Sequence, residues 1–332
     1  MTDVKNALQA AGWDLDKAVQ ELRKKGLAAA SKKASRHAAE GLVGISKTDR
    51  AAAAVEINSE TDFVARNDQF RSLVSSAAAA ALQLPPTAVG AGCELDLEAL
   101  KDAKLEDGTR LEDAVVGVAG SVRENIRLRR GFAVAVPEGG RGLVGSYLHT
   151  AAAPGLGRIA GLVALQSGEE LGAAAAAAVQ EPSFPRFLFM DKVGPSSSPG
   201  ERVTELAGKL AMHVVGTKPQ YLSREHVPED ALAAERALLT EQALKSGKPA
   251  NIVERMVAGR LGKFYEEWCL LEQPYILDDS QKVKDVLAAA AKQAGCGKLQ
   301  VTSFVRVQVG EGLEAEQKDF AAEVAETLKA VA

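Results

Sequence analysis

Cysteine and histidine are scarce in this chain of 332 residues, and that scarcity excludes several kinds of protein. The three cysteines, Cys93, Cys269 and Cys296, are odd in number and far apart. They fit neither a disulfide framework nor a zinc site, and they favour a reducing compartment. The four histidines are scattered, without the close spacing of a metal-binding pair. The sequence also lacks an apolar run of about 18 residues, so we expect no membrane span.

An excess of charge of one sign is missing as well. The net charge of −4 argues against a protein that binds nucleic acid through its overall field. Two local basic clusters, in residues 23–36 and 123–130, are interpreted as solvated faces.

Residues 1–5 show neither a signal peptide nor a transit segment rich in arginine and serine. We therefore expect either a cytosolic protein or one whose targeting segment is missing from this sequence.

Catalytic motifs are weak. Gly140, Gly142 and Gly145 match the dinucleotide-binding fingerprint by letter, but that motif must be followed by a helix, and residues 146–149 are strand-like. A turn between paired strands at 132–136 and 143–148 is therefore favoured over a nucleotide-binding oxidoreductase. No phosphate-binding loop and no defensible Ser-His-Asp or Cys-His arrangement is present. An interaction protein is better supported than an enzyme.

The most informative segment predicts a strand, a tight turn and a helix. Residues 54–58 alternate apolar and polar, and the polar residues at 59–62 can begin a helix. Asp62 and Phe63 stand side by side at this turn, where they would form a wedge able to enter another protein and disturb a bound ion. The alternative, which pattern alone favours, is that Asp62 caps its own helix and Phe63 packs inward with Phe70.

The rest of the chain divides by composition and periodicity. Residues 3–40 predict a small helical unit, and residues 50–170 mix strands with helices, which indicates the α+β class. Residues 171–200, with six consecutive alanines, are interpreted as an insertion or a plain loop. His213 falls on the apolar side of a predicted helix, where a core histidine is the default interpretation. Residues 228–272 predict two helices that form an antiparallel hairpin with a coiled-coil seam.

Residues 55–67, Val-Glu-Ile-Asn-Ser-Glu-Thr-Asp-Phe-Val-Ala-Arg-Asn, closely resemble the signature of the elongation factor Ts family. Further similar stretches follow in order over nearly the whole chain: residues 14–26, 38–43, 123–130, 145–149, 210–215, 246–249, 271–274 and 307–312. The sequences of residues 213–216 and 266–273 most resemble those of mitochondrial members from plants and algae. The chain departs from the family pattern in a shortened N-terminal module and in the long stretch 171–200.

The resemblance implies an α+β fold with a two-subdomain core, antiparallel sheets, a protruding helical hairpin and a C-terminal helix. The implied division is residues 1–45, a module like the ubiquitin-associated domain with its linker; 46–140, the first subdomain; 141–227, the first part of the second subdomain with the 171–200 insertion; 228–272, a hairpin of the dimerisation type; 273–313, the second part of the second subdomain; and 314–332, a C-terminal helical module.

The resemblance also implies the function. The protein would bind elongation factor Tu and promote exchange of GDP for GTP by disturbing the magnesium and phosphate site of that partner, with no cofactor, metal or bond chemistry of its own. The implied wedge residues are Thr61, Asp62, Phe63, Val64, Arg66 and Asn67, and the secondary contacts are His213, Val214 and Phe320. A self-packed tail is the alternative for Phe320.

The resemblance further implies no direct contact with nucleic acid or membrane, and a possible homodimer through residues 228–272. The expected location is the mitochondrial matrix, with the plastid stroma or a bacterial cytoplasm as alternatives. The competing function is a scaffold that binds through the N-terminal helices without exchange activity.

Overall fold

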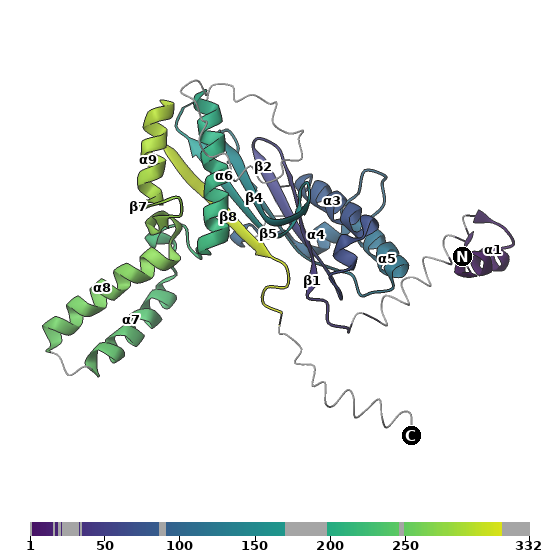
Figure 1. Cartoon of the computed structure of the whole chain (residues 1–332), viewed down its shortest axis with the longest axis horizontal. Helices are drawn as coiled ribbons and strands as arrows, with labels where there is room; N and C mark the ends of the chain where they lie inside the picture. The colour runs from purple at the N-terminus through teal and green to yellow at the C-terminus, as the bar shows by residue number, and fades with distance from the viewer. Residues whose placement is uncertain are drawn as a thin grey trace.

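The computed structural model describes residues 2–15, 17, 18, 21, 33, 35–85, 91–169, 198–245 and 249–313. This part of the chain combines an antiparallel sheet with helices packed on it and a helical hairpin that projects away from it (Figure 1). The predicted α+β class is confirmed. Phe320 and residues 171–197 of the predicted insertion lie outside the described residues, and no helix among those described is long and apolar enough to cross a membrane.

Six strands form one sheet in the order β3-β2-β1-β5-β4, and β8 pairs with residues 159–167 of β5, beyond the short stretch that pairs with β1. The strands are β1 (Glu40–Lys47), β2 (Ala51–Ser59), β3 (Arg127–Ala135), β4 (Arg141–Ala153), β5 (Leu156–Ser167) and β8 (Leu299–Gln308). The predicted pairing of β3 with β4 is wrong, because β3 pairs with β2 and β4 pairs with β5. The predicted boundary between residues 45 and 46 falls inside β1, so the core begins at that strand.

Close packing against a helix explains Gly145 of β4 and Gly161 of β5 (Leu156–Ser167). A Cβ on Gly145 would lie 2.2 Å from the backbone carbon of Ala207, and one on Gly161 would lie 2.3 Å from the carbonyl oxygen of Ala211. Both alanines belong to α6 (Pro199–Thr217), which therefore lies directly on β4 and β5. Close approach of a helix, and not a nucleotide, is the reason for Gly145.

Two halves make up the core. Helices α3 (Asp68–Leu82), α4 (Leu97–Asp102) and α5 (Leu111–Val122) cover β1 to β3, whereas α6 and α9 (Val283–Ala294) cover β4, β5 and β8. The halves are joined in the sheet by only a short pairing of β1 with β5 at residues 43–44 and 156–157. A third apolar cluster draws residues from strands of both halves, so the two sets of strands also pack against each other. This arrangement fits the two predicted subdomains.

The predicted hairpin is formed by α7 (Glu229–Leu244) and α8 (Ala250–Trp268). Leu239 and Ala243 of α7 pack against Val253, Val257 and Leu261 of α8, which confirms the predicted seam. A short 3-10 helix, η6 (Leu270–Glu272), and two short strands, β6 (Pro274–Tyr275) and β7 (Asp278–Lys282), lead from the hairpin back to α9.

The N-terminal unit begins with α1 (Thr2–Ala10). Gly12 and Trp13 adopt left-handed backbone angles just after it, as expected at the end of a helix. The side chain of Asp14 accepts a hydrogen bond from the backbone of Lys17 at 3.1 Å, as predicted for a cap. Most of the predicted second helix lies outside the described residues.

Candidate functional site

The candidate site is the corner between β2 and α3. The turn after Ser59 leads into a single 3-10 turn, η1 (Val64–Arg66), and only then into α3. Asn67 caps α3, since its side-chain oxygen accepts hydrogen bonds from the backbone of Gln69 at 2.9 Å and of Phe70 at 3.3 Å. The helix therefore begins later than the sequence pattern predicts, and its cap is none of the polar residues at 59–62.

Two carboxylates tie this corner to the loop before β3. Glu124 accepts hydrogen bonds from the backbone N–H of Thr61 at 3.0 Å and from its hydroxyl at 2.6 Å. Glu60 in turn accepts one from the backbone N–H of Asn125 at 2.6 Å. Because both acceptors are carboxylates, these are stronger than neutral hydrogen bonds. The corner is thus held on two sides and presents a fixed surface.

Phe63 projects from the corner with 75% of its surface exposed, whereas Phe70 is fully buried. The alternative in which Phe63 packs inward is therefore wrong for this structure. Val64 and the following alanine are buried beneath the turn and take the inward positions that the ring would otherwise occupy. A large exposed aromatic side chain on an anchored turn is able to bury itself in a second protein.

Asp62 lies beside Phe63 and makes an ion pair with Arg66 at 3.2 Å. Their side chains are 47% and 71% exposed, so solvent screens the pair and it contributes little to stability. Asp62 can therefore exchange this partner for another at little cost. The corner therefore offers a partner an exposed acid and an exposed ring side by side.

His213 and Val214 are both completely buried on α6. The Nδ1 atom of His213 accepts a hydrogen bond from the backbone N–H of Ile276 at 3.1 Å, and Nε2 lies 2.9 Å from Oε1 of Gln273. Burial lowers the pKa of His213, although the contact with Gln273 opposes the change. Burial of both side chains fits the core-histidine interpretation, and their role as secondary contacts stays a prediction.

Sequence reasoning missed the anchors of the corner. Glu60, Glu124 and Asn125 were not singled out from the sequence, and their contacts join residues far apart in the chain. The signal available was a polar run directly before a strand, at 123–125. Such a run is also typical of a plain loop.

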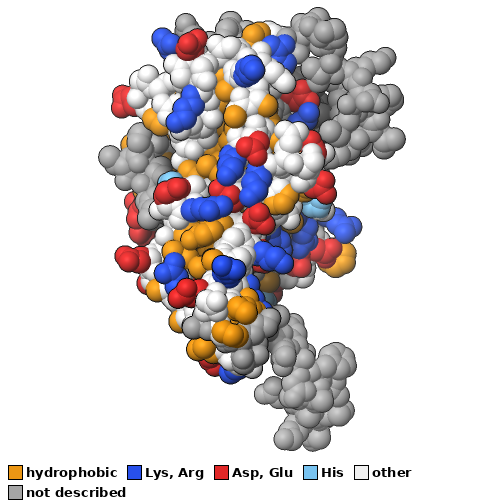
Figure 2. All heavy atoms as spheres, turned by 90° about the vertical axis from the view of Figure 1, so that its left-hand side faces the viewer, with side chains coloured by type: hydrophobic (Ala, Val, Ile, Leu, Met, Phe, Trp, Pro, Cys, Tyr) orange, Lys and Arg blue, Asp and Glu red, His pale blue; other side chains and the backbone are white. Residues whose placement is uncertain are grey.

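Charge does not single out a further site on the face that carries the hairpin. Figure 2 shows acidic and basic side chains interspersed on that face, with apolar atoms between them. Within the described ranges, no group of three or more His, Cys, Asp or Glu residues could hold a metal ion.

Known proteins are similar to this chain over nearly its whole length. A family model described as elongation factor TS matches residues 60–311. Elongation factor Ts of Rhodospirillum rubrum is 43% identical over 331 residues, which cover 99% of this chain and 94% of that protein. The mitochondrial elongation factor Ts of Ostreococcus tauri is 41% identical, covering 99% and 88%. That of Zea mays is also 41% identical, covering 97% and 79%.

Proposed function

Because the chain belongs to the elongation factor Ts family, we propose that it binds elongation factor Tu carrying GDP and promotes release of the nucleotide. The observation that carries this proposal is Phe63, an exposed ring on an anchored corner with Asp62 beside it. A translation elongation factor that acts by exchange needs no chemistry of its own. The arrangement of the corner, which offers contact surface and one charge, suits such a role.

The physical basis is the sensitivity of a magnesium site to small displacements. Magnesium requires nearly ideal octahedral geometry, and it is the largest local charge beside the phosphates of a bound nucleotide. Burial of an aromatic side chain stabilises a complex by about 1.5–3 kcal/mol. Insertion of Phe63 into the nucleotide-binding part of the partner supplies free energy of that size, which can offset displacement of a magnesium ligand.

Each residue of the corner has a separate role in this proposal. Phe63 inserts, and Asp62 presents a negative charge to the region from which magnesium is displaced. Thr61 holds the turn to Glu124, and Val64 fixes its inner side. Asn67 caps α3 and so sets where the rigid part begins, while Arg66 keeps Asp62 oriented until the partner is bound.

Thermodynamic linkage sets the direction of the effect. If this protein weakens GDP binding by some factor, GDP weakens the binding of this protein by the same factor. The protein therefore stabilises the nucleotide-free partner, and GTP displaces it afterwards. GDP leaves faster because a ternary complex offers a second route for release.

The test is release of a fluorescent GDP analogue from elongation factor Tu, chased with unlabelled nucleotide. We expect acceleration by the parent protein and a loss of about 10–100-fold with Phe63→Ala, as follows from the free energy of burying a ring. Leu277→Ala, which removes an apolar side chain that is 38% exposed between β6 and β7, is the matched control. A Phe63→Ala variant as active as the parent would show that the corner is not the wedge, and an inactive parent would refute exchange itself.

We also propose that the protein acts in the mitochondrial matrix, since the relatives from Zea mays and Ostreococcus tauri are mitochondrial forms. A bacterial relative is equally similar, so similarity alone does not decide the compartment. Localisation of the tagged, full-length protein in cells is the measurement that decides it. The hairpin is proposed as a surface for a second copy of the chain. Leu238, Leu244 and Ile252 are exposed there, and sedimentation of the parent against Leu238→Glu tests that role.

A further inference from the structure

Glu56, the acidic residue of β2, lies outside the wedge and is completely buried. Its Oε1 atom accepts hydrogen bonds from Arg129 at 2.9 Å, from the side chain of Asn58 at 3.1 Å and from the backbone N–H of Gly310 at 2.8 Å. Its Oε2 atom accepts one from Nε of Arg130 at 2.6 Å. Burial of a charge is costly unless it is paired and hydrogen-bonded, and here the carboxylate is fully engaged.

A β-bulge makes this double contact possible. Consecutive residues of a regular strand point to opposite faces of the sheet, so two adjacent arginines could not both reach one carboxylate. In β3, however, Arg130 pairs with Glu56 and Leu128 pairs with the next residue of β2, so Arg129 is the extra residue of a bulge. The bulge turns both guanidinium groups toward Glu56.

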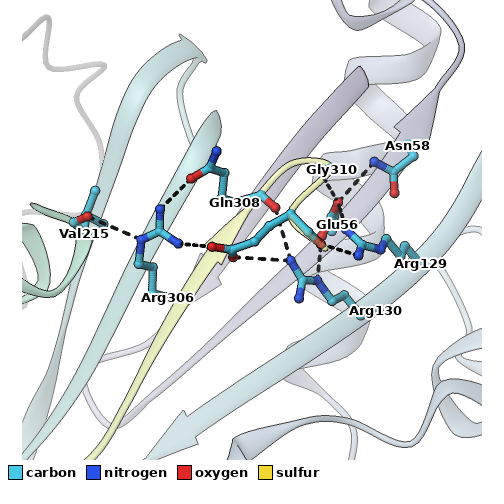
Figure 3. A network of polar contacts seen from close by, with 9 residues as sticks. Glu56, Asn58, Arg129, Arg130, Val215, Arg306, Gln308 and Gly310 are labelled. Atoms are coloured by element: carbon cyan, nitrogen blue, oxygen red, sulfur yellow. Dashed lines mark hydrogen bonds and ion pairs between the residues drawn. The ribbon is translucent and has the colours of Figure 1, made fainter. Parts of the chain in front are cut away.

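The same arginines reach the other half of the core (Figure 3). Arg130 donates a hydrogen bond to the carbonyl oxygen of Gln308 at 3.1 Å, and Arg129 donates one to the carbonyl oxygen of Glu311. The Glu311 carboxylate also pairs with Arg306 at 2.6 Å. Arg306 donates in turn to the last turn of α6, at the carbonyl oxygen of residue 215, at 3.3 Å. We call Glu56, Arg129, Arg130, Arg306 and Glu311 the junction.

The junction is better suited to fixing geometry than to adding stability. Buried ion pairs contribute little net stability compared with apolar packing, because desolvation of the charges offsets their attraction. The apolar cluster between the halves already holds them together, but apolar contact is non-directional. Arginine forks, in contrast, accept only a narrow set of distances and angles. The junction can therefore select one orientation of β2 and β3 relative to β8.

The wedge lies at the end of these same two strands. β2 runs from Glu56 to the turn that carries Asp62 and Phe63, and β3 begins just after Glu124 and Asn125, which hold that turn. A rotation of the two strands at the junction would displace the corner as a unit. We propose that Glu56, Arg129 and Arg130 are positioning residues, which set the placement of Phe63 relative to the second half of the core. This inference rests on the proposed exchange function.

The test is a double-mutant cycle on GDP release from elongation factor Tu. Arg130→Lys keeps a positive charge near Glu56 but loses the second arm of the fork, which spans to Gln308. Misplacement of a reacting group by about 1 Å costs up to about 100-fold in rate, so we expect Arg130→Lys to slow exchange by about tenfold when Phe63 is present. In the Phe63→Ala background we expect almost no further slowing. Protein concentrations are raised until Phe63→Ala alone measurably accelerates release.

Arg224→Lys is the matched control. Arg224 pairs with another carboxylate, Glu272, at 2.9 Å near the base of the hairpin. This control should leave exchange unchanged in both backgrounds. Thermal unfolding of each variant shows whether it is folded, and Glu56→Gln, which removes the central charge, provides a second entry into the cycle.

Equal slowing by Arg130→Lys in both backgrounds would overturn the inference, because the junction would then not act through Phe63. Full exchange activity in both junction variants would overturn it as well. If Phe63→Ala itself had no effect on release, the wedge assignment would fail first, and that result is visible in the same cycle without reference to the junction.

Discussion

Neutralising Glu272 should remove a large and strongly pH-dependent part of the stability of the hairpin base. Its carboxylate follows α8 and is contacted by Arg224 at 2.9 Å, Lys284 at 3.1 Å and Lys282 at 3.4 Å. Burial alone would raise the pKa of Glu272, but the hydrogen bonds from Arg224 and Lys284 outweigh it and lower the pKa to about 2. The ion pairs therefore favour the folded state.

The magnitude follows from linkage. The usual pKa of 4.5 applies to the unfolded chain, and the difference from about 2 corresponds to about 3 kcal/mol, since one pKa unit is worth about 1.4 kcal/mol. The folded pKa is the lower one, so this stabilisation is complete above pH 4.5 and is lost as the pH falls toward 2. At pH 3 about 1.4 kcal/mol of it should remain.

The assay is urea unfolding of the parent and of Glu272→Gln, followed by the fluorescence of Trp268 at the end of α8. The other tryptophan, Trp13, is replaced by Phe in both proteins so that the signal reports the hairpin base alone. We expect a difference of about 3 kcal/mol at pH 7, which shrinks to about 1.4 kcal/mol at pH 3. Glu241→Gln, which removes an exposed pair with Lys245, is the control and should change little at either pH. An equal difference at both pH values would refute an ionic origin.

Two further predictions concern α6. Gly145→Ala should destabilise the second half of the core by about 1–3 kcal/mol or more, because the new methyl group meets the backbone of Ala207. Chemical denaturation measures this loss of unfolding free energy. Gly120→Ala is the control and should not destabilise, since nothing lies within 4 Å of the added methyl group. Burial lowers the pKa of His213 below its usual 6.5, against the opposing contact with Gln273, so the folded protein should lose stability as the pH falls below 6.5 toward that lowered pKa. His213→Gln should flatten this part of the pH profile of the unfolding midpoint. An unchanged slope would contradict the assignment.

The features that were predictable from the sequence are those set by local periodicity. The seam of Val253, Val257 and Leu261 is spaced as a coiled coil, and these residues pack as expected against α7. The alternation before Ser59 likewise located β2, although its polar residues Glu56 and Asn58 are buried together with the apolar ones. Such patterns depend only on which face of one element is buried, so neighbours in the chain carry the information.

The position of Phe63 could not be derived in this way. Phe63 and Phe70 are spaced so that one continuous helix would place both on the same face, which is why the pattern favoured inward packing. The structure interrupts that helix at Asn67, whose backbone is extended with φ −73° and ψ 133°. The interruption separates the two rings, and Phe63 faces solvent. Contacts from Glu124, far along the chain, hold the turn in this form.

Long-range pairing also explains the other errors. The β3 and β4 sequences suit a hairpin, but each strand gains a different neighbour once the two halves form. The junction around Glu56 depends on a bulge in β3 and on residues near 310, and neither follows from the pattern of β2 alone.

Under the proposed function, the anchors of the corner bear on whether burial of a single ring supplies enough free energy for exchange. Ordering one residue of a flexible turn costs about 1–2 kcal/mol in backbone entropy, so ordering only two would consume the free energy that burial of Phe63 supplies. In this structure the turn is already ordered before any partner is met, through Glu60, Glu124 and Asn67. The free energy of burying the ring then remains available to distort the site of the partner. Under the proposed exchange function, we therefore expect the carboxylates that hold the corner to matter nearly as much as the ring.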